Sequence, residues 1–533
     1  MILLEDPTTR ESQAEDHPLS WGQRALWMAE RLAPGEAPYN LAAAGRVLGE
    51  INAGALRRAF EILTARHPAL RTTFHETAPG EPVQRVHAAM APDVAVVEIA
   101  PEDLCQRLAE EAWRPFDLEA GPPLRVRLFT GMPEGAVLLV AVHHLASDLA
   151  SLSILGQELG ALLRDEHAEL PPVPAGPAEW AERQERLADE RRGAWWREHL
   201  AGELPALDLP TDRPRPPILT YRGDSRVLRL EPETLDALRA VARAEGATLW
   251  AALLTGVGAW LSRITGQEEL LLGSPVSLRT GPFTSALGYF VELTVLREDV
   301  SGRPSFTELL RRSRREAFSA LRHAGYPFAL LAEQLQAGRD PSRHPLVQVL
   351  LALQGAGLAA FALAEEGDRT PLGDLELEGV AIPERRLPFD LSLLAAEAEG
   401  GLAISCQYNA ALFDGTSVER LLAAFETLLS GMTAEPVRPV AELPLLGEVE
   451  RAQILEEWSG AGVEVSGEEC LHDLVFAQAL RTPQATAVIH GTERTTYEEL
   501  AHRAEELATT LRGMGIAPEA RVGVLLDRGT DMV

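Results

Sequence analysis

A continuous apolar run that ends in two histidines constrains the fold of this chain most strongly. The run, Gly135–Val142, has the length and composition of a buried strand. After Asp148 the apolar residues recur at helical spacing, as Leu149, Leu152, Leu155, Leu159 and Leu163. His143–Asp148 therefore lies on a turn between a strand and a helix, where side chains can project into a cleft.

Helices and strands alternate over most of the remaining sequence. Ser20 is a suitable N-cap for a helix that carries Gln23, Leu26, Trp27 and Leu32. The alternation continues to about residue 431 and predicts the α/β class. The same patterns predict further helices over Asn52–Arg66, Pro232–Gly246 and Thr248–Thr265, and strands over Arg71–Phe74 and Glu269–Val276.

The chain is too long for a single core, because it has 533 residues. Residues 1–17 are polar and predict a disordered leader. Pro-rich breaks follow at Leu170–Pro177 and Pro210–Pro217. Residues 446–468 predict a linker with one helix, Glu448–Trp458, and residues 469–533 predict a further unit. In that unit we expect a helix after Cys470, then the strand Ala485–His490, the helix Thr496–Met514 and the strand Arg521–Leu526.

Charge and cysteine content exclude several classes of protein. The chain has no lysine, and its 49 arginines face 79 acidic residues, which gives a net charge of −30. Such a chain is repelled by nucleic acid and by anionic membranes. The start of the chain does not resemble a signal peptide, and no apolar stretch is long enough to cross a bilayer. Cys105, Cys406 and Cys470 share no metal-binding spacing, so we expect inert thiols, no metal site and a cytoplasmic location.

The turn His143–Asp148 carries the residue types that proton transfer requires. A histidine titrates near neutral pH and can take or give a proton during acyl transfer. At the end of a strand, the neighbouring histidine points the opposite way and serves packing. A buried aspartate needs an arginine or backbone donors. On this motif alone, a solvated pair of loop histidines explains the sequence equally well.

Neighbouring motifs decide between these interpretations. Together with the turn, they occur in the order that is found in condensation domains of nonribosomal peptide synthetases, and the chain resembles that family over about Leu19–Ala441. The matching segments are Leu19–Trp27, Arg66–Phe74, His143–Asp148, Gly273–Arg279, Gly288–Val291, Tyr326–Phe328 and Arg339–Leu346.

The resemblance implies two lobes, each similar to chloramphenicol acetyltransferase, that form a V shape around a central tunnel. We place the lobes at residues 18–185 and 186–445. Donor and acceptor carrier proteins would insert 4'-phosphopantetheine arms into the tunnel, and the chain itself would bind no cofactor. His144 would be catalytic, through positioning and stabilisation of the tetrahedral intermediate rather than through proton removal. His143 and Asp148 would hold the loop, with Arg279 as the first expected partner of Asp148 and Arg71 as the second.

The last residues resemble the opening of an adenylation domain. The segment Thr495–Leu500 and the pattern through Asp527 carry this resemblance. The phosphate loop and the catalytic lysine of that family would lie beyond Val533. The order of the two domains implies an extension module whose own amino acid is the acceptor. Because only a short leader precedes the first domain, we expect the donor to arrive from a separate polypeptide, although an engineered start would look the same.

Two positions depart from the pattern of the family. Leu149 and Ala150 stand where a glycine and an aromatic residue usually follow the aspartate, before Ser151. Glu292 and Leu293 replace the usual Asn and Thr. We expect Leu149, Ala150, Ser151 and Glu292 to lie along the substrate tunnel. The changes resemble subtypes that accept polyketide-derived or modified donors, or that dehydrate a seryl residue during condensation.

Other members of the superfamily fit the sequence less well. Heterocyclisation domains replace the first histidine by aspartate, and epimerisation domains usually precede a condensation domain. A stand-alone acyltransferase does not explain the start of an adenylation domain. A non-catalytic scaffold that recruits partner proteins is the alternative from a different class, and it is disfavoured because His143, His144 and Asp148 are all present.

Overall fold

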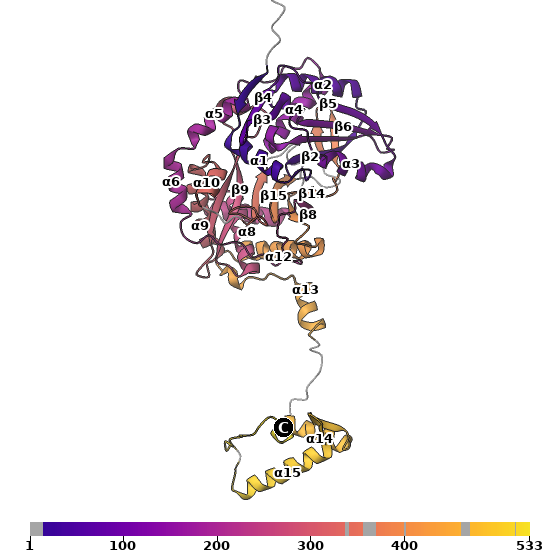
Figure 1. Cartoon of the computed structure of the whole chain (residues 1–533). Coiled ribbons are helices and arrows are strands. Elements are labelled where there is room, and N and C mark those ends of the chain that lie inside the picture. Colours follow the sequence, from indigo (N-terminus) through magenta and orange to yellow (C-terminus); the bar gives the residue numbers. More distant parts are fainter. Residues whose placement is uncertain (1–13, 336–339, 355–368, 399–400, 460–469, 518) are drawn as a thin grey trace, which may run out of the picture. The chain divides into compact units, whose positions relative to one another are not determined.

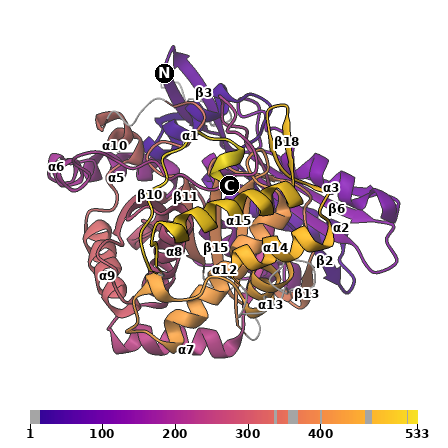
Figure 2. The same cartoon turned by 90° about the horizontal axis from the view of Figure 1, so that it is seen from below.

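The structure, a computed structural model, describes residues 14–335, 340–354, 369–398, 401–459, 470–517 and 519–533. The chain forms two compact units that divide between Gly447 and Glu448. Figure 1 and Figure 2 show their elements from two directions. The α/β class that the sequence predicts is confirmed, since helices and strands alternate through both units.

The first lobe is built on a six-stranded sheet with the order β12-β13-β2-β7-β6-β5. Its central strand, β7 (Val137–His143), is the predicted buried strand, and it pairs with β2 (Asn40–Leu48) and β6 (Leu124–Thr130). Leu138, Val140 and Val142 face one hydrophobic cluster, and the alternate residues of β7 face another. Both faces of β7 are thus covered, which explains why its sequence is apolar without alternation.

Three helices cover the two faces of this sheet. The helices α2 (Ala53–Arg66) and α4 (Leu149–Arg164) contribute to the cluster on one face, and α3 (Leu104–Trp113) covers the other. The strand at the far end of the sheet order, β5 (Asp93–Glu98), runs parallel to β6 at the edge. This arrangement buries α4 along its length and fixes the position of its N-terminus.

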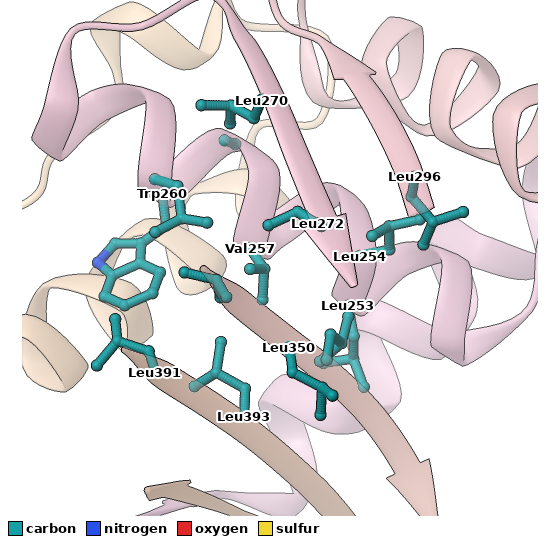
Figure 3. Close-up of a cluster of buried hydrophobic side chains, with 14 of the residues drawn as sticks. Leu253, Leu254, Val257, Trp260, Leu270, Leu272, Leu296, Leu350, Leu391 and Leu393 are labelled. Carbon is teal, nitrogen blue, oxygen red and sulfur yellow. The ribbon is translucent and has the colours of Figure 1, made fainter. Parts of the chain in front are cut away.

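The second lobe contains the largest hydrophobic cluster and a seven-stranded sheet with the order β10-β9-β11-β15-β16-β8-β14. In Figure 3, Leu253, Leu254, Val257 and Trp260 of one helix gather against leucines of neighbouring strands. The strands are β8 (Arg222–Leu230), β9 (Glu269–Ser277), β10 (Val291–Asp299), β11 (Val349–Gln354), β14 (Arg385–Arg386), β15 (Leu391–Ala398) and β16 (Gly401–Asn409). The helices of this lobe are α7 (Pro232–Ala244), α8 (Leu249–Thr265), α9 (Phe306–Arg322) and α12 (Gly415–Ala434), and the connecting helices are α5 (Pro177–Leu187), α6 (Glu190–His199) and α10 (Phe328–Gln334).

Two strands from late in the chain belong to the first lobe. The strands β12 (Arg369–Leu372) and β13 (Leu375–Gly379) form a hairpin, and β13 pairs with β2. Their hairpin turn passes so close to α4 that a Cβ on Gly160 would lie 2.5 Å from the backbone nitrogen of Gly373. The predicted assignment of all residues 186–445 to one lobe is therefore wrong for this hairpin, because the missing edge of the first sheet is supplied from outside that lobe's own range.

A small sheet with the order β1-β4-β3 corrects the predicted leader. Residues 1–13 lie outside the described residues, but Glu15–Pro18 forms the strand β1 rather than a disordered tail. It pairs with β4 (Glu81–Val86), which also pairs with β3 (Thr72–Ala78). An edge strand is held by backbone hydrogen bonds and needs no apolar side chains, so its polar sequence concealed it. Arg85 supports the pairing with a bidentate contact to Asp16.

The second unit contains most of the elements that the sequence predicts. They are α13 (Glu448–Ala452), followed by a π-helical turn at Gln453–Glu457, and then α14 (Leu471–Arg481), β17 (Thr486–His490), β18 (Glu493–Thr496) and α15 (Tyr497–Gly513). The predicted strand Arg521–Leu526 is wrong, because this segment has no regular structure and pairs with no described strand. Its apolar side chains are exposed, Leu525 almost completely. Residues 460–469 of the predicted linker lie outside the described residues.

The cysteines differ in their surroundings. Cys406 is buried, whereas Cys105 and Cys470 are exposed, so the expectation of buried thiols holds for one of the three. Cys470, His472 and Asp473 each place one potential ligand atom within 4.8 Å of the others, all on exposed side chains. Asp473 also accepts the backbone N–H of Cys470 as part of a helix cap. Among the described helices, none is by itself long and apolar enough to cross a membrane, and only the bent pair α7 and α8 reaches that length and composition together.

The contact between α4 and the hairpin predicts a large effect of a single methyl group. In Gly160→Ala the new Cβ meets backbone atoms, which cannot rotate away, so we expect a loss of about 2 kcal/mol in the free energy of unfolding. Gly258→Ala in α8 is the matched control, because its Cβ would make only ordinary contacts, at 3.6 Å or more. There we expect no loss, or a gain of up to about 1 kcal/mol from helix propensity. Urea unfolding of both variants measures the difference, and equal stabilities would contradict the prediction.

Candidate active site

The predicted strand, turn and helix around the two histidines are confirmed. Strand β7 ends at His143, a short 3-10 turn covers His144–Ala146, and Asp148 is the N-cap of α4. The backbone N–H of His144 donates to the carbonyl of Tyr39 (2.8 Å), which ties the turn to the start of β2. The turn is thus held at both ends before its side chains make any contact.

His143 points into the protein and serves packing. Its side chain is 1% exposed, and its Nδ1 accepts the backbone N–H of Leu145 (3.1 Å). Its Nε2 lies 3.6 Å from a carboxylate oxygen of Glu30, and its ring meets that of Phe116 edge-on. These contacts fix the backbone from which His144 projects.

His144 presents one nitrogen to a cavity. Its Nδ1 lies 2.6 Å from the carbonyl oxygen of Ser147, which can only accept, so Nδ1 carries the proton in the neutral ring. The lone pair is then on Nε2, on the side of the ring that lines the cavity. Burial lowers the pKa of His144, opposed by the Ser147 carbonyl and the charge of Asp148. The neutral imidazole is therefore favoured at neutral pH.

Asp148 is surrounded by donors from both lobes. Its Oδ1 accepts the backbone N–H of Ser151 (2.8 Å) and Nη2 of Arg279 (2.7 Å), while its Oδ2 accepts the backbone N–H of Phe290 (3.1 Å). The ion pair is nearly free of solvent, since the side chains of Arg279 and Asp148 are 7% and 1% exposed. Arg279 also donates to the carbonyls of Phe283 and Ala286.

Of the two arginines expected at Asp148, the structure brings only Arg279 to it. Arg71 instead donates to the carbonyl of His87, and no contact between Arg71 and Asp148 is present in the described part of the chain. Arg71 ends a 3-10 turn that leads into the small three-stranded sheet, and this sheet directs its side chain away from the histidine turn. The second choice is therefore wrong.

The cavity has a volume of about 390 Å³ and receives residues from both lobes. Leu149 and Ala150 line it, as expected for tunnel residues. Most of its wall is apolar, with polar groups at a few positions. The lining residues are Asn40, Leu41, Ala42, Trp113, His144, Asp148, Leu149, Ala150, Leu152, Pro275, Ser277, Val291, Leu350, Ala352, Leu353, Gln354, Arg385, Arg386, Leu394 and Gln407.

Ser151 and Glu292 do not line this cavity, contrary to expectation. Ser151 is the third residue of α4 and turns inward, where its Oγ bonds to Asp148 and Gly288. Glu292 follows Val291 on β10, and the alternation of a strand places the two side chains on opposite faces. Only Val291 thus reaches the cavity.

Glu292 is instead buried in a polar junction that the sequence did not indicate. Its carboxylate accepts Nε2 of Gln184 (2.7 Å) and the backbone N–H of Phe328 (2.9 Å). The amide oxygen of Gln184 in turn accepts the backbone N–H of Trp21 (2.7 Å). Burial raises the pKa of Glu292 to about 8, although these donors oppose the shift. The junction links α1 (Trp21–Leu32), α5, β10 and the start of α10.

Comparison with known proteins decides the family. A family model for the condensation domain matches residues 13–455, and one for AMP-binding enzymes matches residues 475–533. This chain belongs to the condensation-domain family of nonribosomal peptide synthetases. The predicted class, an acyltransferase that forms amide bonds, is thereby confirmed at the level of the family, as is the start of an adenylation domain after it.

Curated relatives are multidomain synthetases. The linear gramicidin synthase of Brevibacillus parabrevis includes a protein that is 35% identical over 554 residues, which cover 100% of this chain and 7% of that protein. Phosphinothricin tripeptide synthetase PhsB of Streptomyces viridochromogenes is 36% identical over 544 residues, which cover 97% of this chain and 44% of that protein. The chain thus spans less than half the length of these relatives.

Solved structures share the fold. A four-domain nonribosomal peptide synthetase bound to AMP and glycine has a TM-score of 0.77 at 21% identity and covers 96% of this chain and 40% of its own. The first condensation domain of the calcium-dependent antibiotic synthetase has a TM-score of 0.66 at 20% identity, with coverages of 81% and 99%. The X-domain from teicoplanin biosynthesis has a TM-score of 0.71 at 27% identity, with coverages of 83% and 99%. The expected pair of lobes is the architecture of this family.

The buried ion pair predicts different costs for its two candidate arginines. Arg279→Gln leaves the Asp148 carboxylate buried without its cation, so we expect a loss of about 3–5 kcal/mol in the free energy of unfolding. Arg71→Gln removes contacts at the margin of the small sheet and should cost about 1 kcal/mol. Chemical denaturation compares them, and a loss in Arg279→Gln no larger than in Arg71→Gln would contradict the role of the ion pair.

Proposed function

We propose that the domain joins a donor acyl or peptidyl thioester to the amine of an acceptor aminoacyl thioester. Both substrates are carried on 4'-phosphopantetheine arms of carrier proteins, and the chain binds no further cofactor for this reaction. The single observation that carries the proposal is the placement of the His144 Nε2 lone pair at a largely apolar cavity lined by both lobes. His144 is the catalytic residue, and His143, Asp148 and Arg279 support it.

The geometry favours positioning as the role of His144. The acceptor nitrogen adds to the donor carbonyl and forms the C–N bond, and the tetrahedral intermediate then breaks its C–S bond. The proton that the amine loses leaves with the departing thiol. The Nε2 lone pair accepts a hydrogen bond from the attacking amine and so aligns it. The apolar wall around Leu149 and Leu152 limits water, which would otherwise hydrolyse the thioester.

The domain arrangement supports a place in an extension module. In this proposal residues 18–185 and 186–445 are the two lobes, except for the hairpin β12–β13, and 446–468 link them to the adenylation start at 469–533. The adenylation domain downstream selects the acceptor amino acid, and a carrier protein on each side delivers a substrate. The family match to an AMP-binding enzyme immediately after the condensation domain supports this order.

The first turn of α4 supports a donor that differs from a plain aminoacyl group. Leu149 and Ala150 line the cavity next to His144, where the family usually has a glycine and an aromatic residue. A branched side chain followed by a small one changes the shape of the wall along the donor. We infer that the donor is polyketide-derived or otherwise modified, or a seryl group that loses water during condensation.

A non-catalytic docking domain is the second candidate. One relative in fold, the X-domain from teicoplanin biosynthesis, was solved in a complex with OxyB, which shows that this fold can recruit a protein partner. The intact contacts of His143, His144 and Asp148 favour catalysis, because a recruiting surface does not require a proton acceptor at a buried cavity.

Replacement of His144 tests the enzymatic proposal. With donor and acceptor carrier proteins loaded, His144→Ala should reduce amide formation by at least about 100-fold, because it removes the group that aligns the amine. His167→Ala, at a side chain that is 85% exposed, is the control and should leave the rate unchanged. Intact mass spectrometry of the acceptor carrier measures the product. Unchanged product with His144→Ala would contradict catalysis and leave the docking role.

Leu149 is the position at which the identity of the donor can be tested. Leu149→Gly restores the residue that is usual in the family, so we expect a plain aminoacyl donor to gain about 10-fold relative to an acyl, modified or seryl donor. Competition between pairs of donors on carrier proteins, read by mass, gives the ratio and reports any loss of water. An unchanged ratio would contradict donor selection at this residue.

A further inference from the structure

Tyr289 brings an aromatic ring from the second lobe to the histidine of the first. It lies in the segment that joins β9 to β10, whereas His144 lies after β7. The two ring centroids are 5.0 Å apart at an interplanar angle of 80°, an edge-to-face contact. Tyr289 is not among the residues that line the cavity, so its contact is with the imidazole and not with the substrate space.

The ring of Tyr289 enters a slot in the first lobe. It packs against a hydrophobic cluster that includes Leu19, Leu26 and Leu145, all of which belong to that lobe. Gly22, in the first turn of α1, leaves the slot open. A Cβ at this position would lie 2.3 Å from Cε1 of Tyr289, a distance at which the ring must move.

Both backbone neighbours of Tyr289 are held to the first turn of α4. The Oγ of Ser151 lies 3.1 Å from the amide nitrogen of Gly288, which donates to it, and 3.0 Å from the carbonyl oxygen of Gly288. On the other side, the backbone N–H of Phe290 donates to Oδ2 of Asp148 (3.1 Å). The ring therefore has little freedom to leave His144 while the two lobes are docked.

We propose that Tyr289 is a positioning residue for His144, which seats the imidazole through a ring inserted across the boundary between the lobes. The proposal rests on the function proposed for His144. Ser147 holds Nδ1 of His144 from one side, and Tyr289 limits rotation of the ring from another. Together they direct Nε2 toward the cavity. Because the two rings come from different lobes, His144 is fully oriented only when the lobes are docked.

A double-mutant cycle between Gly22 and Tyr289 tests this insertion. Tyr289→Ala should lower kcat by about 10- to 100-fold with KM changed less than about 3-fold, because the arm still binds while Nε2 is less well placed. Tyr289→Phe keeps the ring and should stay within about 3-fold of wild type. Gly22→Ala should lower kcat in the wild-type chain but have no further effect on Tyr289→Ala, which has no ring to displace.

The titration of His144 provides a readout without turnover. Loss of the Tyr289 ring exposes the imidazole, so its lowered pKa should rise toward the ordinary value by about 0.5–1 unit in Tyr289→Ala. Histidine-labelled protein, with His144 assigned from His144→Gln, reports this pKa by NMR. The acidic limb of kcat/KM should move to higher pH by the same amount, since the neutral ring is the active form.

Each result decides between distinct outcomes. Additive losses for Gly22→Ala and Tyr289→Ala, or an unchanged pKa of His144 in Tyr289→Ala, would overturn the positioning role. Retained activity in His144→Ala would instead overturn the proposed function, while the NMR titration would still report whether Tyr289 seats the ring. A loss in Tyr289→Phe as large as in Tyr289→Ala would also overturn the proposal, because it would assign the effect to the hydroxyl group.

Discussion

The buried ion pair between Asp148 and Arg279 is the interaction on which the site depends. It joins the N-terminus of α4 in the first lobe to the segment after β9 in the second, with both side chains almost free of solvent. A charge buried to this degree must keep its partner. The contacts of Ser151 with Gly288 and of Asp148 with Phe290 form around the pair and extend it. The orientation of His144 thus follows from how the lobes meet.

The sequence was sufficient wherever the determinants are local. Continuous apolar character identified β7, helical spacing identified α4, and the alternation of a strand assigned His143 to packing and His144 to a cleft. The partner of Asp148 required more. Charge alone left Arg279 and Arg71 as alternatives, and only the fold shows that one of them lies 2.7 Å from the carboxylate.

The remainder depends on contacts between distant segments. Glu292 and Ser151 were placed along the tunnel because they are near cavity residues in sequence, but the pleat of β10 and the first turn of α4 direct them elsewhere. The strand β1 is held by its neighbour and not by its own composition. Arg521–Leu526 has the composition of a strand but no strand to pair with in the described part of the chain.

The hairpin β12–β13 has a consequence for how such domains can be recombined. Because β13 completes the sheet of the first lobe beside β2, that lobe is assembled from two stretches of chain. An exchange of the first lobe between synthetases at a single crossover near residue 185 would combine a foreign sheet with the resident hairpin, and its closest contact, Gly160 with Gly373, tolerates no added side-chain atom. Hybrid enzymes of this type need a second crossover that carries residues 369–379 with the lobe they complete.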